Sequence, residues 1–361
     1  MNGLKEILVR PEVSVKDAIE NMGASGRRVV VVVDSSSKFH GIFTDGDMRR
    51  YILKGGNLSI PIREAMNRSP YVLPVGCTHD DLQRCFVERN RFLCPIVDSQ
   101  GRLREVVFRD EYSENLENFV MPQLPDGVET VIMAGGLGKR LYPYTKVLPK
   151  ALIPIGDKPI LTHVIDKFKA FGCRKFHLIV NHKRNLIKAY YAEEDPGCQL
   201  VYHDEETPLG PAGGLCYVKG LMDRAFFLSN CDILVDADYA EIYAFHKREG
   251  NLITAVGALR QVEVPYGVIE IGGSGSSIKA ISEKPTSTYL ANVGVYVLEP
   301  KVLDDVEDQK VLLITDLIAR YIREGKKVGV YPVAGGAWQD MGQLDEMKKM
   351  EQTLEKRLAC K

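Results

Sequence analysis

Apolar and polar positions follow the same plan twice in the first part of the chain. The first copy has a polar helix over Val15–Met22, the apolar run RVVVVVD and the segment GIFTDGDMRRYIL, which passes from strand to helix. The second copy lies about sixty residues later, with a helix around Asp80–Arg89, the run FLCPIVD and the segment RLREVVFRDEY. Each copy predicts a small α/β unit, and two units that each hide one apolar face are expected to pack together.

From Glu129 onward, short apolar strands alternate with helices. The predicted order is strand ETVIMAG, a helix over Leu161–Phe171, strands KFHLIV, QLVYHDE and RAFFLSNCD, and a helix over Tyr239–Arg248. This alternation predicts an α/β fold with a doubly wound, mostly parallel sheet. Ligands of such sheets bind beyond the carboxyl ends of the strands, so the chemically important residues are expected directly after strands.

The segment NFVMPQLPDGVE has two prolines, a glycine and no periodicity, and it separates the two patterns. We therefore predict four parts: an N-terminal module over 1–120, a linker over 121–127, a second domain over 128–349 and a C-terminal helix over 350–361.

Composition excludes several classes of protein. The chain is 45% hydrophobic and 26% charged with a net charge of -1, so it offers no general basic field for nucleic acid or an anionic membrane. Its start lacks the apolar core of a signal peptide, and no apolar run approaches the roughly 20 residues that cross a bilayer. The eight cysteines are scattered, which favours free thiols in the cytoplasm over disulfides or a zinc site.

The segment MAGGLGKRLYPYTKVLPKALIPIGDKPIL is the main candidate for a ligand site. Its glycines directly follow a buried strand, where backbone amides can approach phosphate oxygens. The spacing differs from that of a P-loop, and two prolines exclude a dinucleotide-binding helix. Fixed cations in such a loop would stabilise charge on a departing pyrophosphate, although ordinary surface lysines are the alternative. The loop cations are Lys139, Arg140, Lys146 and Lys150.

This stretch resembles the signature of the sugar-phosphate nucleotidyltransferases (nucleoside-diphosphate-sugar pyrophosphorylases). The resemblance covers residues 128–349 and rests on several spaced motifs. It implies that Arg140 grips the triphosphate and that Lys150 contacts phosphate, while the role of Lys139 stays open. It also implies that the loop holds the nucleotide through Ala134, Gly135, Gly136 and Gly138.

Two acids lie far apart in the sequence, each after an apolar segment. Asp232 ends the segment FFLSNCD, and Asp340 lies in WQDMG. Mg²⁺ typically takes one or two carboxylates together with substrate phosphates and water. Taken alone, each acid is more simply a cap or turn residue. The resemblance implies instead that the pair holds Mg²⁺ and that Arg140, Lys150 and Asp232 are catalytic.

Three further motifs resemble the sugar pocket of this family. They are PYGV with Gly267, SEKP with Glu283 and Lys284, and ANVG with Asn292. A turn at the first motif and an exposed ion pair at the second are the alternatives that need no sugar.

The segment TPLGPAGGL bears on the base. It resembles a segment of guanylyltransferases and some thymidylyltransferases, whereas relatives that bind uridine or thymidine often carry a glutamine there. The nucleotide-binding positions are Gly210, Gly213 and Gly214, and small residues leave room for a purine, which favours GTP. Because a sugar-1-phosphate oxygen is already anionic, the reaction needs alignment and charge screening rather than a general base.

The N-terminal repeat resembles a tandem cystathionine-β-synthase-type (CBS) module, a regulatory unit that often binds adenine nucleotides. The resemblance implies that Thr44 and Asp47, in GIFTDGD, contact a ribose. In the second copy Asp110 matches the acid, but Val107 replaces the threonine, which makes a second site doubtful. A dimerisation scaffold without ligand is the alternative, and either interpretation predicts a homodimer or a larger assembly.

Together these features predict the reaction of a nucleoside triphosphate with a sugar-1-phosphate to give a nucleoside-diphosphate sugar and pyrophosphate. We expect guanylyl transfer to a hexosamine-, hexose- or heptose-1-phosphate. The hexosamine is favoured, because a CBS pair before such a domain resembles the glucosamine-1-phosphate guanylyltransferases of legionaminic acid pathways. One alternative is uridylyl or thymidylyl transfer to a hexose-1-phosphate. Another is an inactive nucleotide sensor, which would lack one of the four key side chains, although all are present: Arg140, Lys150, Asp232 and Asp340.

Overall fold

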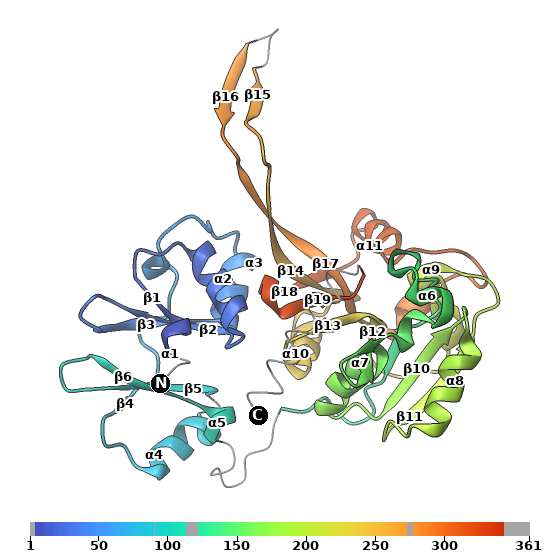
Figure 1. The fold of residues 1–361 in the computed structure, drawn as a ribbon, viewed down its shortest axis with the longest axis horizontal. Coiled ribbons are helices and arrows are strands. Elements are labelled where there is room, and N and C mark those ends of the chain that lie inside the picture. Colours follow the sequence, from blue (N-terminus) through green and yellow to red (C-terminus); the bar gives the residue numbers. More distant parts are fainter. Residues whose placement is uncertain (1–3, 90, 113–121, 273–276, 343–361) are drawn as a thin grey trace.

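The computed structural model describes residues 4–89, 91–112, 122–272 and 277–342. Two parts are visible in Figure 1, an N-terminal part in blue to teal and a larger α/β part in green to red. The predicted C-terminal helix over 350–361 lies outside the described residues, as does the end of the predicted N-terminal module. Within the described ranges, no helix is long and apolar enough to cross a membrane.

The N-terminal part consists of two units with the same strand order. One sheet has the order β1-β2-β3 and the other β4-β5-β6, and in each the first pair is parallel and the second antiparallel. The strands are β1 Leu8–Val9, β2 Val29–Val33, β3 Phe39–Thr44, β4 Leu73–Pro74, β5 Leu93–Val97 and β6 Leu103–Phe108. The helices are α1 Leu4–Ile7, α2 Val15–Ser25, α3 Asp45–Leu53, η1 Ile62–Glu64, α4 His79–Gln83, η2 Arg84–Glu88 and α5 Arg109–Tyr112.

Local capping explains where the helices of these units begin and end. Ser14 caps α2 by accepting from the Asp17 amide, and Gly26, at φ 67°, ends it. The helix therefore runs three residues beyond the predicted end at Met22. The helix predicted around Asp80–Arg89 is α4 followed by a π-helical turn.

The larger part is built on a seven-stranded sheet with the order β11-β10-β7-β12-β17-β14-β18. Four of the strand pairs are parallel, and β17 runs antiparallel to both of its neighbours. The structure thus confirms the predicted α/β fold with a mostly parallel sheet. The strands are β7 Thr130–Met133, β10 Lys175–Val180, β11 Gln199–Asp204, β12 Phe226–Asn230, β14 Ile253–Glu263, β17 Thr286–Leu298 and β18 Val328–Val333.

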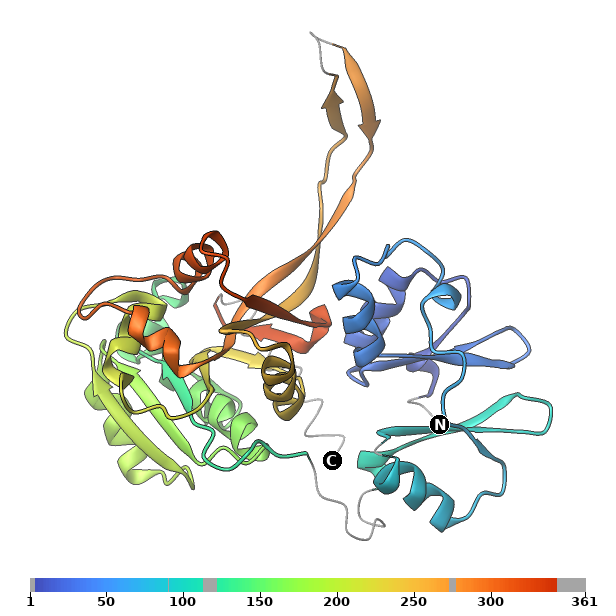
Figure 2. The same cartoon turned by 180° about the vertical axis from the view of Figure 1, so that it is seen from behind.

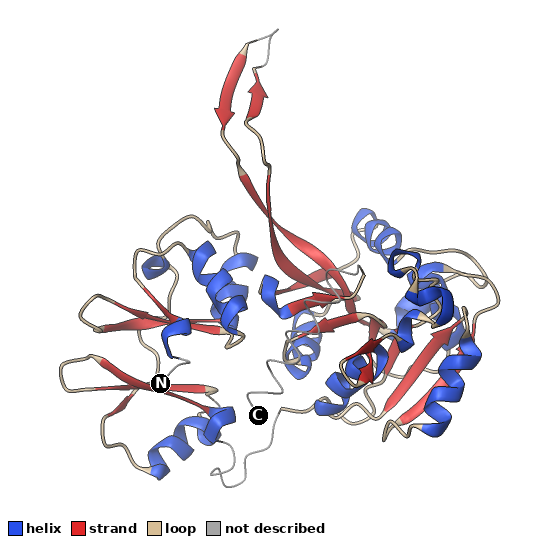
Figure 3. Cartoon of the chain, in the orientation of Figure 1, coloured by secondary structure: helices blue, strands red, loops and turns tan. Residues whose placement is uncertain are grey.

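Helices cover both faces of this sheet (Figure 3). They are α6 Tyr144–Val147, α7 Ile160–Ala170, α8 Arg184–Glu193, α9 Gly210–Gly213, α10 Tyr239–Glu249 and α11 Ile314–Arg323, with short 3₁₀ turns η4 Lys139–Leu141, η5 Lys150–Leu152, η6 Gly214–Val218, η7 Pro300–Asp305 and η8 Gly335–Ala337. Three small sheets accompany them: β8 Pro154–Ile155 with β9 Lys158–Pro159, β13 Ile233–Val235 with β19 Trp338–Asp340, and β15 Val268–Ile271 with β16 Ile278–Ser282.

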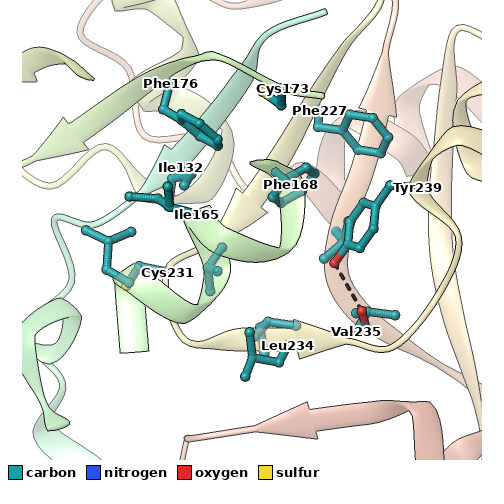
Figure 4. Close-up of a cluster of buried hydrophobic side chains, with 14 of the residues drawn as sticks. Ile132, Ile165, Phe168, Cys173, Phe176, Phe227, Cys231, Leu234, Val235 and Tyr239 are labelled. Atoms are coloured by element: carbon teal, nitrogen blue, oxygen red, sulfur yellow. Dashed lines mark hydrogen bonds between the residues drawn. The ribbon is translucent and has the colours of Figure 1, made fainter. Parts of the chain in front are cut away.

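Successive residues of the strands point to opposite faces of the sheet, and an apolar core lies on each face. Val131 and its neighbour Ile132, for example, belong to different buried clusters. In the larger core, the ring of Phe168 on α7 lies 5.2 Å from that of Phe227 on β12 and 4.4 Å from that of Tyr239 on α10 (Figure 4). The Tyr239 hydroxyl donates to the Val235 carbonyl, which fixes the end of β13.

Strands β14 and β17 continue beyond the sheet as a two-stranded arm that ends in β15 and β16. Figures 1 and 2 show this arm projecting from the body of the protein in both views. Every residue of β15 and β16 is exposed. The arm therefore has a different environment from the strands that support the core.

Candidate functional site

The candidate site lies where four neighbouring parallel strands end. Strands β11, β10, β7 and β12 are adjacent, and their carboxyl ends meet at one edge of the sheet. The glycine-rich loop follows β7, and one polar side chain follows each of the others: Asn181 after β10, Glu205 after β11 and Asp232 after β12. This is the edge at which doubly wound sheets bind ligands.

The glycine-rich loop is held by hydrogen bonds to its backbone. Gly138 adopts φ +62°, and a β-carbon there would lie 2.8 Å from Thr145 Cγ2. The Thr145 hydroxyl donates to the Gly138 carbonyl at 2.9 Å. From the next loop, the Lys183 ammonium donates to the carbonyls of Thr145 and Lys146 at 3.0 and 2.6 Å. Only glycine fits at position 138, and the loop is tied to the end of β10.

The start of the loop lies against the polar side chains of the sheet edge. Ala134 is buried, and its amide continues the sheet by donating to the Ile179 carbonyl at 2.8 Å. A β-carbon on Gly135 would lie 3.0 Å from Glu205 Oε2, whereas Gly136 has open space around it. The backbone of the loop is therefore accessible at Gly136 and packed at Gly135.

The catalytic cation and acid predicted from the sequence are in contact. The Lys150 ammonium on η5 donates to Asp232 Oδ2, and both side chains are largely buried. Arg140, on η4, is exposed at the other end of the loop. The positive charges of Lys150 and Arg140 both act on Asp340, where they offset part of a rise in its pKa.

The structure brings Asp232 and Asp340 together by a route that the sequence does not predict. They meet through the separate β13–β19 pair, in which Ile233 is opposite Asp340, rather than through the main sheet. The Met341 amide donates to the Asp232 carbonyl at 3.1 Å. Burial, and next the charge of Asp232, raise the pKa of Asp340 despite the nearby cations.

The two carboxylates fit a divalent cation, because they lie at the same end of the β13–β19 pair. The charge of Asp232 is, after burial, the second cause of the raised pKa of Asp340, and a dication at this point would relieve that repulsion. Mg²⁺ commonly binds through one or two carboxylates and takes its other ligands from substrate phosphates and water. Among the described residues, no group of three or more His, Cys, Asp or Glu side chains could hold a metal ion by itself. A cation held here would therefore share its coordination with the substrate.

A cavity of about 440 Å³ lies beside the loop, at the ends of β10 and β11. Glu205 lines it with only 4% of its surface exposed, and burial raises the pKa of this carboxyl group. Glu205 Oε1 accepts from the Leu209 amide at 3.0 Å, and its carbonyl accepts from Asn181 Nδ2 at 2.6 Å. The side chain is thus fixed in position with Oε2 beside Gly135.

The glycines of TPLGPAGGL have tightly packed surroundings. Gly210 adopts φ +78° at the start of α9. A β-carbon on Gly213 would lie 2.5 Å from the Lys310 carbonyl oxygen, and one on Gly214 would lie 2.8 Å from Met133 Cε. These contacts explain the glycines by close packing of backbone carbonyl groups and side chains within the protein, and not by the open space that the sequence argument expected. Their contact with a nucleotide stays a prediction.

The predicted sugar-binding residues divide into two places. Asn292 lies midway along β17, where its Nδ2 donates to the Tyr296 hydroxyl at 2.7 Å. Gly267, Glu283 and Lys284 lie instead in the segments that join β14 to β15 and β16 to β17, drawn in tan halfway along the arm in Figure 3. A β-carbon on Gly267 would lie 3.0 Å from Glu283 Oε2, so these motifs are adjacent on the arm. The structure does not bring them to Asp232.

Comparison with known proteins assigns the larger part of the chain. The sequence model described as nucleotidyl transferase matches residues 129–357. The chain belongs to the nucleotidyl transferase family. A second model, that of the CBS domain, matches residues 5–54, which include the first N-terminal unit.

Relatives of this nucleotidyl transferase include mannose-1-phosphate guanyltransferase of Schizosaccharomyces pombe, 31% identical over 228 residues, which are 60% of this chain and 61% of the relative. Mannose-1-phosphate guanylyltransferase catalytic subunit beta of Drosophila melanogaster is 30% identical over 231 residues, which are 62% of this chain and 61% of the relative. The chain thus spans about three fifths of the length of these curated relatives. HddC from Yersinia pseudotuberculosis has the same fold, with a TM-score of 0.51 at 22% identity over 63% of this chain and 99% of its own.

In the N-terminal part of this nucleotidyl transferase, the two residues predicted to contact a ribose, Thr44 and Asp47, are hydrogen-bonded to each other. The amide and the hydroxyl of Thr44 both donate to Asp47 Oδ2, at 2.9 and 2.7 Å, and the Asp47 amide donates back to the Thr44 hydroxyl. This reciprocal pair is a capping box at the start of α3. A ribose at these residues remains a prediction.

Two polar residues of the site were not predicted. Glu205 was included in the predicted strand, and Lys183 was given no role, although both follow strands. The rule that ligands bind beyond strand ends would have selected Glu205, because β11 ends at Asp204. No sequence signal marks Lys183, whose role depends on φ +56° and on the carbonyls it reaches.

Proposed function

We propose that this nucleotidyl transferase is a sugar-1-phosphate guanylyltransferase, which converts GTP and a sugar-1-phosphate to a GDP-sugar and pyrophosphate. The observation that carries the choice of base is the buried carboxyl group of Glu205 at the wall of the cavity beside the glycine-rich loop. The names of the relatives from Schizosaccharomyces pombe and Drosophila melanogaster, both guanylyl-transferring enzymes, support the same choice.

The argument for guanine rests on hydrogen-bond donors. Guanine presents a ring N–H and an amino group side by side, and an ionised carboxylate can accept from both. Uracil and thymine present one N–H between two carbonyl oxygens, which a carboxylate would repel. Glu205 has one oxygen held by the Leu209 amide and the other beside Gly135, at the strand end next to the loop that is proposed to hold the phosphates. A base in the cavity would therefore meet an acceptor at a fixed position.

Catalysis would consist of alignment and charge stabilisation. An oxygen of the sugar-1-phosphate attacks the α-phosphorus of GTP, and the bond from the α-phosphorus to the oxygen of the β-phosphate breaks as pyrophosphate leaves with the electron pair. Lys150 would bind phosphate oxygens from its position on Asp232, and Arg140 would contact the leaving group. Asp232 and Asp340 would hold Mg²⁺, which supplies positive charge between the two polyanions.

The finer parts of the proposal concern the substrate and the assembly. We propose glucosamine-1-phosphate as the acceptor and legionaminic acid synthesis as the setting, on the combination of a CBS domain with this transferase. By the same resemblance, we propose an adenine nucleotide at the N-terminal module and a homodimer formed through its helices. The described cysteines are free thiols, which supports a cytoplasmic location.

The deciding experiment measures pyrophosphate release with GTP, ATP, UTP and dTTP, each against glucosamine-1-phosphate, mannose-1-phosphate and glucose-1-phosphate. We expect the highest kcat/KM with GTP and glucosamine-1-phosphate, and no release without Mg²⁺. Release with UTP or dTTP but not GTP would contradict the assignment of the base. Activity with mannose-1-phosphate alone would retain guanylyl transfer and overturn the hexosamine, whereas binding of GTP without release would identify a sensor.

A further inference from the structure

The first N-terminal unit contacts the transferase domain where the β13–β19 pair begins. Helix α2 presents Gly23 to Gly336 on η8, the turn that leads directly into β19. A β-carbon on Gly23 would lie 3.0 Å from the Gly336 nitrogen, and one on Gly336 would lie 2.5 Å from the Gly23 oxygen. The two backbones are in direct contact, so Gly336 has no space for a side chain, and a side chain at Gly23 would have to displace the Gly336 backbone.

The other strand of the pair is held by an arginine from the same unit. Arg28 Nη2 donates to Asp236 Oδ1 at 2.8 Å, and Asp236 directly follows β13. Lys167 on α7 donates to the same oxygen at 3.2 Å. The Asp236 amide donates to the Ala337 carbonyl at 2.7 Å, so the two contact points are bonded to each other.

Further contacts hold the first N-terminal unit in place against the transferase domain. Leu259 and Ala334 of the transferase domain belong to the same buried apolar cluster as the core of α2 and β2. The guanidinium of Arg49 lies 4.1 Å from the centre of the Tyr331 ring and 3.7 Å from Glu241. Buried apolar contacts and partly buried charges together fix the position of α2 against η8.

The contact points near Gly336 and Asp236 lie at one end of the β13–β19 pair, and the two acids lie at the other end. Asp232 directly precedes β13, and Asp340 ends β19. A strand rises by about 3.3 Å per residue, so Gly336 and Asp236 lie roughly 13 Å along the chain from these carboxylates. Each strand of the pair is short, and displacement of one end moves the other.

We propose that Gly23 and Arg28 are positioning residues, through which the N-terminal unit sets the separation of the Asp232 and Asp340 carboxylates. This inference rests on the proposed function for its activity measurement and on the geometry alone for the others. A displaced α2 would push β19 through Gly336, or release β13 through Asp236, without touching substrate. A displacement of the N-terminal unit would then be transmitted through the β13–β19 pair to the two carboxylates.

The test is Gly23→Ala, matched by Glu20→Ala at an exposed position of the same helix. Alanine favours a helix over glycine, so helix propensity should not lower the melting temperature of either variant. In Gly23→Ala we expect the affinity for Mn²⁺ alone, followed by electron paramagnetic resonance, to fall about tenfold. We also expect kcat to fall with little change in the KM for GTP, and Glu20→Ala to match the wild type.

The fluorescence of Trp338 provides a measurement that needs neither metal nor turnover. It is the single tryptophan of the chain, it lies on β19 two residues before Asp340, and the Arg260 guanidinium lies 4.6 Å from the centre of its ring. Gly23→Ala should shift its emission, and Glu20→Ala should not. Emission and Mn²⁺ affinity that are unchanged in Gly23→Ala would overturn the proposal.

Arg28→Ala provides a second test if Gly23→Ala does not fold, with Arg27→Ala as its control. Arg27 forms ion pairs with Asp110 and Glu111 inside the N-terminal part. We expect only Arg28→Ala to weaken Mn²⁺ binding, and Asp236→Ala to add no further weakening to it. Equal losses in the two arginine variants would overturn the proposal. If the wild type releases no pyrophosphate with any nucleotide, the proposed function fails, while fluorescence and Mn²⁺ binding still decide this inference.

Discussion

The edge of the seven-stranded sheet and the two-stranded arm carry different halves of the candidate site. At the sheet edge, Asp232 and Glu205 are buried, bonded and anchored on strands with core on both faces. On the arm, Glu283 and Lys284 are exposed, and β15 and β16 beyond them are exposed throughout. The proposed phosphate and base side is thus preorganised, and the proposed sugar side is not.

This difference predicts which residues should contribute most to the free energy and the specificity of substrate binding. Fixed groups at the sheet edge lose little conformational entropy when a ligand arrives, so their removal should be costly. A two-stranded ribbon without a packing partner is only marginally stable in water. Residues on the arm should therefore affect the binding of one substrate, with little effect on folding.

The largest effect is expected at the sheet edge from Asp232→Asn. We expect kcat to fall about a thousandfold, the scale for the loss of a preorganised electrostatic contact, with the fold retained. Pyrophosphate release measures kcat, and circular dichroism shows whether the fold is retained. Asp157→Asn, at an exposed turn between β8 and β9, is the control. Undiminished turnover in Asp232→Asn would remove the contrast between edge and arm.

Glu205→Gln should have the next largest effect, confined to the nucleotide. An amide replaces one acceptor by a donor, so the KM for GTP should rise about 10- to 100-fold, with Glu193→Gln on the exposed face of α8 unchanged. Initial rates at varied GTP measure this. A KM for GTP that Glu205→Gln leaves at the wild-type value would show that the carboxylate does not bind the base.

The same residue predicts a pH dependence. Burial raises the pKa of Glu205, so on acidification it gains a proton at a higher pH than an ordinary glutamate and loses its charge as an acceptor. The KM for GTP should therefore rise as the pH falls through that raised pKa. Glu205→Gln should show a flat profile over the same range, and a profile that keeps its slope would assign the titration to another group.

The smallest effect is expected on the arm, from Glu283→Ala. Because the side chain is exposed, the melting temperature should stay at the wild-type value, while the KM for the sugar-1-phosphate rises about three- to tenfold through the loss of one hydrogen bond. Lys279→Ala, which breaks an exposed ion pair with Glu270 on the same arm, is the control. A large loss of stability would show that the arm is packed in solution, contrary to the comparison.

The fold was predictable to the extent that it depends on local periodicity. The run Val29–Val33 and the alternation after Glu129 predicted buried strands and a mostly parallel sheet, because burial on two faces demands continuous apolar runs. Asp232 and Lys150 were predicted from spaced motifs, and the structure places them in contact. The positions of Gly267 and Glu283 on the arm were not predictable. The pattern of apolar and polar residues does not show whether a two-stranded ribbon packs against the rest of the domain or projects from it.

Long-range contacts account for the other differences. The β13–β19 pair joins residues about a hundred positions apart, and such pairing leaves no local pattern in strands of three residues. Gly213 suggested open space when considered alone, because the Lys310 carbonyl that fills it comes from a distant loop. Glycine identity marks where something approaches closely, but the sequence does not say whether a ligand or the protein itself does so.

The capping box at the start of α3 has a consequence for any ligand of the N-terminal part. A ribose that bonds to Thr44 and Asp47 has to replace hydrogen bonds that these residues already exchange, so binding there is a competition with the helix terminus. The first turn of α3 would loosen, and the Asp47 amide would exchange its proton with water more rapidly. The affinity of a ligand at this position would therefore depend as much on how readily the helix frays as on the contacts that the ligand makes.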